Sequence, residues 1–160
     1  MTTSFREILQ VLNRHGVHYI VVGGVAAVIH GAPMTTFDLD TLVRIDQNNA
    51  KRLAQALSEL EARFREHDRL VEPTTDDILA GGHLLLMTRA GPLDVLGFIG
   101  NRQRYEDLLS SSSEVALAAG SIRVLNLDAL IAEKKGMTRP KDRAALELLE
   151  EVLRHRRGRE

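Results

Sequence analysis

The chain has 160 residues, 44% hydrophobic and 27% charged, a composition typical of one folded globular domain. Its 21 basic and 22 acidic residues give a net charge of −1, so any contact with nucleic acid has to be local. The absence of cysteine excludes disulfides, thiolate zinc sites and cysteine nucleophiles. Neither a signal-peptide pattern nor a membrane-length apolar run is present, so we expect a cytoplasmic protein without membrane association.

The N-terminal part of the chain predicts a helix, a strand, a glycine turn and a second helix. Apolar side chains recur at helical spacing over residues 5–12. Residues 19–22 are a β-branched and aromatic run, typical of a strand, and Gly23 and Gly24 end it before a short helix at 25–30. This order presents free backbone N–H groups at the start of a helix, where phosphate can bind.

The next segment predicts a strand that carries two carboxylates. Residues 39–45 alternate apolar and polar positions, which places Asp38 and Asp40 on the same side. Two carboxylates at this spacing can converge on a hard divalent cation such as Mg²⁺. Asp94 is a candidate third ligand, because it interrupts the apolar run 93–96, where a charge is costly unless a cation compensates it.

Each of these features also has a purely structural interpretation. Asp38 could cap a turn, Asp40 could pair with Arg44, and Asp94 could lie on a solvated edge. Asp-x-Asp alone favours that interpretation, just as an isolated Gly-Gly favours tight packing of a strand on a helix. The occurrence of the glycine pair and both aspartates in one short segment favours adjoining phosphate and metal sites instead.

The remaining sequence predicts an α/β (α+β) fold in one domain, residues 1–160. We expect a core at about 17–100, with a small mixed, twisted sheet holding all three aspartates on one face, and C-terminal helices at about 126–156 that close the cleft. The further elements are a helix at 48–65 with Phe64 on its apolar stripe, a hairpin of 83–89 and 93–98 around a turn at 90–92, a loop at 110–113, a hairpin of 114–118 and 121–125, and helices at 127–135 and 140–155.

The segment VVGGVAAVIHGAPMTTFDLDTLV resembles the signature of the polymerase-β-like nucleotidyltransferase superfamily, specifically its small bacterial branch of abortive-infection and toxin–antitoxin nucleotidyltransferases. The positions that carry the resemblance are Gly23, Gly24, Ala26, His30, Gly31, Thr36, Asp38 and Asp40. It extends to Leu93-Asp94-Val95, which is similar to the family's third-carboxylate strand, and to LIAEKKGMTRPKDRAALELL, which is similar to the C-terminal helices of the branch.

This resemblance implies magnesium-dependent transfer of a nucleoside monophosphate from a nucleoside triphosphate to a hydroxyl of RNA, protein or a small molecule. It implies that the Gly23-Gly24 turn cradles the triphosphate, that Asp38 and Asp40 bind two Mg²⁺ ions, and that Asp94 completes the second metal site and helps deprotonate the acceptor. Such chemistry depends on positioning and on neutralisation of charge.

Two further residues are candidates for nucleotide binding. Thr36 belongs to the segment that carries the resemblance, between the glycine pair and the two aspartates. Lys134 continues the apolar stripe of the helix expected at 127–135, so it should point inward and meet an anion such as a substrate phosphate. The alternative for Lys134 is a lysine that extends to solvent at the rim of the core. Arg139 and Lys141 also match basic positions of the branch, although solvated surface charges are the commoner explanation.

Two positions depart from the branch, since Met34 replaces an arginine and Ala145 replaces an acidic residue. Val25 replaces a serine found in many superfamily members, a change that the small branch tolerates. The alternative function is therefore a catalytically silent nucleotide-binding domain, or a toxin–antitoxin module that contacts a cognate partner protein. The short chain favours a macromolecular acceptor over a dedicated small-molecule activity, and leucine-rich terminal helices favour a homodimer.

Overall fold

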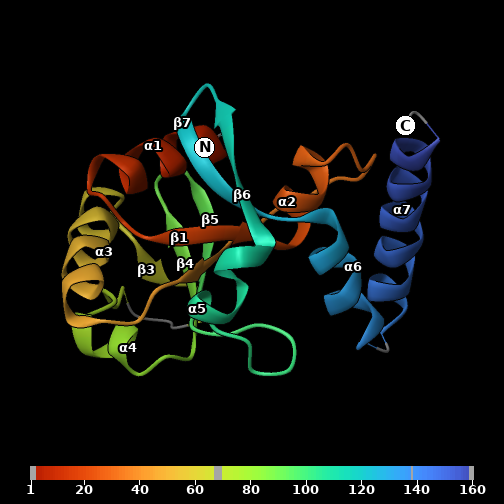
Figure 1. Ribbon diagram of the computed structural model, residues 1–160. Coiled ribbons are helices and arrows are strands. Elements are labelled where there is room, and N and C mark those ends of the chain that lie inside the picture. Colours follow the sequence, from red (N-terminus) through yellow and green to blue (C-terminus); the bar gives the residue numbers. More distant parts are fainter. Residues whose placement is uncertain (1–2, 67–69, 138, 159–160) are drawn as a thin grey trace.

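The structure is a computed structural model that describes residues 3–66, 70–137 and 139–158. A mixed sheet of seven strands, in the order β3-β4-β5-β2-β1-β7-β6, forms its centre (Figure 1). The strands are β1 (Tyr19–Val22), β2 (Leu39–Val43), β3 (Arg63–Phe64), β4 (His83–Thr88), β5 (Gly91–Leu96), β6 (Ser112–Leu117) and β7 (Gly120–Leu125). The expected α/β fold with a mixed sheet is confirmed.

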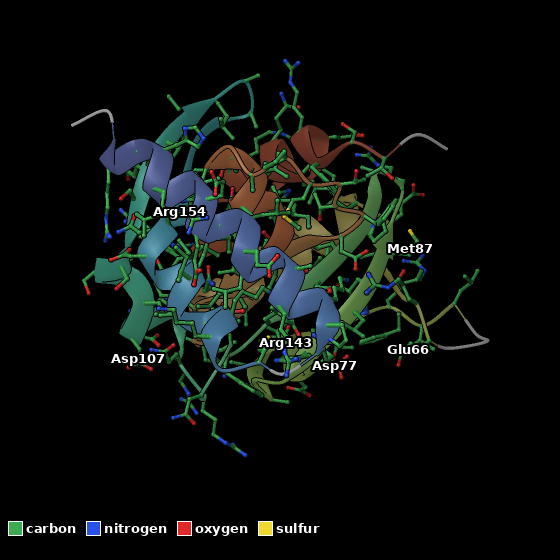
Figure 2. All side chains as sticks on the ribbon, turned by 90° about the vertical axis from the view of Figure 1, so that its right-hand side faces the viewer. Glu66, Asp77, Met87, Asp107, Arg143 and Arg154 are labelled. Carbon is green, nitrogen blue, oxygen red and sulfur yellow. The ribbon has the colours of Figure 1, made fainter. Side chains whose placement is uncertain are left out.

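Helices flank this sheet on both sides. They are α1 (Phe5–Arg14), α2 (Gly23–Ile29), α3 (Gln47–Glu59), α4 (Thr75–Leu79), α5 (Tyr105–Leu108), α6 (Leu127–Lys135) and α7 (Pro140–Arg157), with a 3-10 turn at Leu109–Ser111. In Figure 1, α1 and α3 lie on one side of the sheet, and α2, α6 and α7 lie on the other. Figure 2 views the molecule from the second side, where α7 crosses the front between Arg143 and Arg154. No described helix is long and apolar enough to cross a membrane.

The pairing of the central strands brings two of the three aspartates together. Strand β2 runs antiparallel to β1, with Asp40 opposite Val22, and parallel to β5, with Asp40 opposite Asp94. Because paired positions on adjacent strands direct their side chains to the same face of a sheet, Asp40 and Asp94 are immediate neighbours. Asp38 lies one residue before β2, so the expectation that it is part of the strand is wrong.

The core packs between the sheet and the first helices. The stripe expected at 5–12 is confirmed, because Ile8, Leu9 and Leu12 of α1 are buried, and Leu53 and Leu57 of α3 join them. Burial of large aliphatic side chains of this kind contributes about 1.5–3 kcal/mol each. This packing makes the sheet a rigid support for residues on its other face.

The helix expected at 48–65 is too long. Helix α3 ends at Glu59, and Glu61 adopts a left-handed backbone with φ of 55°. Phe64 lies in β3, where it pairs with Leu86 of β4. The apolar spacing of Phe64 fits a continuing helix, but pairing with the sheet determines its conformation.

Other boundaries also differ from those expected. The loop expected at 110–113 is the end of a 3-10 turn followed by β6, because Ser112 pairs with Leu125 of β7. Gly91 and Pro92, expected in a turn, belong to β5. Helices α4 and α5 and strand β3 were not expected, because elements of two to five residues are too short to show a period.

A buried asparagine connects α3 to the strands that carry the aspartates. Asn49 is 1% exposed. Its Oδ1 accepts from the backbone N–H of His18 at 2.8 Å, and its Nδ2 donates to the carbonyls of His18 at 3.0 Å and Arg44 at 2.7 Å. These bonds join the segment before β1 to the segment after β2, so Asn49 supports the pairing that positions Asp40.

We expect Asn49→Ala to lower the free energy of unfolding by about 1–3 kcal/mol, because three partly buried backbone groups each lose a hydrogen bond to the Asn49 side chain. Asn48→Ala is the matched control, since Asn48 is exposed on the same helix turn, and it should change stability by less than about 0.5 kcal/mol. Urea denaturation measures both. Equal effects of the two substitutions would contradict the role of Asn49.

Candidate active site

A cleft of about 490 Å³ opens between the sheet and the two C-terminal helices. Its walls come from the start of α2, the segment 34–38, strands β2 and β5, and helices α6 and α7. The structure brings the seven candidate residues for metal and nucleotide binding into this one cleft: Gly23, Gly24, Thr36, Asp38, Asp40, Asp94 and Lys134. Residues far apart in the chain therefore line the same cleft.

The glycine pair makes room for two of these side chains. Gly23 has φ of +65°, and a Cβ atom there would lie 2.2 Å from Asp40 Oδ2. A Cβ atom on Gly24 would lie 2.6 Å from Thr36 Oγ1, and that hydroxyl donates to the Asp38 carbonyl at 3.2 Å. Both glycines are thus required by the close approach of side chains, which the sequence alone does not show.

Helix α2 begins directly at the glycine turn and points its first turn at the cleft. Val22, the residue before it, has no polar side chain to cap the first backbone N–H groups. Gly23 and Gly24 both line the cleft. Free N–H groups at a helix start attract anions, so this end of the cleft suits a phosphate.

The surroundings of Asp40 do not compensate the negative charge of its ionised form. Within the part of the chain that the structure describes, its Oδ1 is buried and has no hydrogen-bond partner. Burial, followed by the nearby carboxylates of Asp94 and Asp38, raises the pKa of Asp40 to about 7, and Lys134 offsets only part of this effect. A cation bound beside Asp40 would remove the energetic cost of ionising it.

Asp94 has a partner that sequence analysis missed. Arg65, just after β3, donates from Nη2 to Asp94 Oδ1 at 2.6 Å and from Nη1 to the Leu86 carbonyl at 2.6 Å. The cation that the apolar run around Asp94 required is therefore an arginine of this chain. The nearest sequence signal is a basic residue close to a short edge strand, which is too common to have indicated the pair.

The carboxylate oxygens of the cleft are of the type that binds divalent cations, although the three aspartates are not gathered around one point as a set of metal ligands. Among residues 3–66, 70–137 and 139–158, no three carboxylate or imidazole groups lie together as a metal site. The unpaired, buried Oδ1 of Asp40 and the neighbouring Asp38 supply the oxygen ligands that Mg²⁺ prefers. Asp94 differs from the other two aspartates because Arg65 holds one of its oxygens.

Lys134 points into the cleft, as expected, but an anion of the chain already meets it. Its Nζ lies 3.0 Å from Asp142 Oδ1, and Arg139 Nε lies 2.8 Å from Asp142 Oδ2. Asp142 is 1% exposed and sits in the first turn of α7. The pair joins α6 to α7, and it holds the Lys134 ammonium at the cleft wall.

The three departures from the family pattern have different surroundings. Met34 and Ala145 line the cleft, whereas Val25 is buried in the core. His30 lies outside this cleft: its Nε2 bonds with the Leu125 carbonyl at 2.8 Å, and Arg156 Nη2 lies 3.0 Å from its Nδ1. His30 therefore connects α2 to β7 and α7.

The seven-stranded mixed sheet and its flanking helices match the fold of solved nucleotidyltransferase structures. No protein-family model matches the sequence, and no curated protein matches it either.

Several solved nucleotidyltransferase structures share this fold. Lincosamide antibiotic adenylyltransferase LnuA, bound to lincomycin, aligns with a TM-score of 0.65 over 95% of this chain and 99% of that chain, at 14% identity. ANT(2'')-Ia in complex with adenylyl-2''-tobramycin aligns with a TM-score of 0.58 over 91% of this chain and 85% of that chain, at 16% identity. An antigenic nucleotidyltransferase-like protein from Paracoccidioides brasiliensis aligns with a TM-score of 0.53 over 92% of this chain and 72% of that chain, at 14% identity.

We expect Asp40→Asn to stabilise the metal-free protein by about 1–2 kcal/mol near pH 8, because it removes an uncompensated charge. The folded form holds an extra proton on Asp40 between the ordinary aspartate pKa of about 4 and the folded value of about 7. The charge therefore costs stability only as the pH rises through that window.

The stability advantage of Asp40→Asn should thus grow between about pH 5 and about pH 8, as measured by urea denaturation in EDTA at each pH. Asp76→Asn, which changes an exposed aspartate of α4, serves as the control and should show no such trend. An advantage that is absent, or equal at both pH values, would contradict the uncompensated charge.

Proposed function

We propose that this chain is a magnesium-dependent nucleotidyltransferase that moves a nucleoside monophosphate from a nucleoside triphosphate to a hydroxyl of an acceptor. The observation that carries the proposal is the cleft that gathers the glycine turn, three aspartates and Lys134 around an unpaired carboxylate oxygen of Asp40. The nucleotidyltransferase fold of the chain supports the same reaction class.

In this proposal, the nucleotide lies along the cleft with its phosphates at the glycine turn. The backbone N–H groups that begin α2 bind the triphosphate, and Thr36 fixes the turn from the opposite side. Lys134 adds a positive charge at the wall formed by α6. Asp38 and Asp40, with Asp94, would hold magnesium, which neutralises phosphate charge and orients the reacting groups when it is bound.

The reaction is a substitution at the α-phosphorus. The acceptor oxygen forms a bond to this phosphorus while the bond to the bridging oxygen breaks, and pyrophosphate leaves. Asp94 takes the proton of the acceptor hydroxyl through the oxygen that Arg65 does not hold. The chain contributes mainly position and charge, which is sufficient for phosphoryl-type transfer.

We propose a small molecule as the acceptor. The structures of similar fold contain lincomycin in one case and adenylyl-2''-tobramycin in the other. A cleft of about 490 Å³ is within the range that small-molecule sites occupy. This choice departs from the macromolecular acceptor that chain length alone favoured, and RNA or protein acceptors become outcomes of the test.

Transfer is tested by incubating the protein with magnesium and each α-labelled nucleoside triphosphate, together with hydroxylated small molecules, total RNA or lysate protein. We expect label on a small molecule, with lincomycin and tobramycin as the first probes, and none with Asp40→Asn. Nucleotide binding without transfer to any pool would support the catalytically silent module. Absence of magnesium-dependent nucleotide binding would contradict both.

We expect Lys134→Met to weaken binding of a magnesium–nucleoside triphosphate by about tenfold, because one charge-assisted contact to phosphate is lost. Lys135→Met is the matched control, since Lys135 is the exposed neighbour on the same helix. Isothermal titration calorimetry with a non-hydrolysable triphosphate measures both. If Lys134→Met and Lys135→Met bind equally well, the role of Lys134 is wrong.

Membership of the toxin–antitoxin branch, a cognate partner protein and a homodimer remain predictions that rest on the sequence alone, as does a cytoplasmic location. So does the assignment of the whole chain to one domain.

A further inference from the structure

Arg65 lies at one end of a row of side chains that crosses the sheet. Its backbone N–H donates to the Leu85 carbonyl at 3.0 Å, and its guanidinium bonds the Leu86 carbonyl. From there it reaches across β4 to Asp94 on β5, and Asp40 on β2 follows next in register. Two contacts with the backbone of β4 thus fix where this guanidinium lies.

The Arg65 side chain is largely buried, at 22% exposed, and Asp94 is 14% exposed. Asp94 lines the cleft, whereas Arg65 is not among the cleft residues and approaches Asp94 from outside it. In a largely buried, charge-assisted pair of this kind, removing one partner leaves the other charge without compensation. Arg65 therefore holds Asp94 without blocking the cleft.

The two neighbouring carboxylates are consequently unequal. Asp94 has a cation of the chain on Oδ1, and Asp40 Oδ1 has no partner among the described residues. Without the guanidinium, two adjacent carboxylates would both lack compensation, and their combined negative charge would bind a divalent cation more tightly. Arg65 therefore neutralises the negative charge of Asp94, which a second bound cation would otherwise neutralise.

We propose that Arg65 is a positioning residue that keeps Asp94 paired, and out of a metal site, while the cleft is free of nucleotide. The inference rests on the proposed function, because it concerns the same carboxylates. In the absence of nucleotide, a divalent cation binds Asp38 and Asp40 but competes with Arg65 for Asp94. A triphosphate brings negative charge and its own cation, so the complete set of carboxylates assembles only with the substrate.

The test measures the affinity of the nucleotide-free protein for Mn²⁺, with electron paramagnetic resonance as the readout of bound and free ion. Arg65→Gln retains a donor for the Leu86 carbonyl but removes the charge, and we expect it to bind Mn²⁺ at least about tenfold more tightly than the native chain. Adding Asp94→Asn to Arg65→Gln should abolish this gain. Arg63→Gln is the matched control, because Arg63 pairs with Glu72 at 3.0 Å on the same edge strand, and it should leave the affinity unchanged.

Arg65→Lys provides an independent check, because it keeps the charge, and we expect it to bind Mn²⁺ within about threefold of the native chain. The proposal is overturned if Arg65→Gln binds no more tightly than the native chain, or if Arg65→Lys gains as much as Arg65→Gln. In either case a loss of Mn²⁺ binding in Asp40→Asn would leave the proposed function intact. If Asp40→Asn leaves Mn²⁺ binding unchanged in both the native chain and the Arg65→Gln variant, the proposed metal site is wrong, and this inference is overturned with it.

Discussion

Two carboxylates on adjacent parallel strands are the constraint on which the rest of this structure depends. The register of β2 with β5 places Asp40 beside Asp94, and the loop before β2 adds Asp38. Repulsion and burial make this arrangement unfavourable in the absence of a cation, as the raised pKa of Asp40 indicates. A fold that retains such a cluster has to hold it in place by other interactions.

Those interactions come from several directions. The core between the sheet and helices α1 and α3 makes the strands rigid, and the hydrogen bonds of Asn49 fix the ends of β1 and β2. Arg65 neutralises Asp94 from the edge of the sheet. Asp142 holds Lys134 in place from α7, so that a positive charge faces the carboxylates across the cleft. Among the carboxylates that line the cleft, Asp40 has a buried oxygen, Oδ1, without a partner in the described part of the chain, and a cation would be most favourable beside this oxygen.

Much of the candidate site was predictable because most of its residues lie within one short segment. Gly23, Gly24, Thr36, Asp38 and Asp40 occur in a strand–turn–helix–strand pattern that local periodicity reveals. The placement of Asp94 followed from a charge in an apolar run. The same patterns predicted a mixed sheet and the two C-terminal helices, and α6 begins and ends at the residues expected.

What sequence reasoning missed depends on contacts between distant residues. The pairs of Arg65 with Asp94 and of Lys134 with Asp142 join different elements, and no local period indicates them. The reason for the glycine pair is also non-local, because the side chains that need the space come from Asp40 and Thr36. The end of α3 was misplaced because Phe64 fits a helical stripe, whereas tertiary pairing with β4 decides its state.

The most direct test of the account is to locate the metal. Crystals grown with Mn²⁺ and a non-hydrolysable nucleoside triphosphate would give an anomalous signal at each bound ion. The account predicts a peak about 2.0–2.4 Å from the carboxylate oxygens of Asp40, beside Asp38 and the triphosphate. A triphosphate bound in the cleft with Mn²⁺ away from Asp40, or Mn²⁺ bound only elsewhere on the protein, would contradict it.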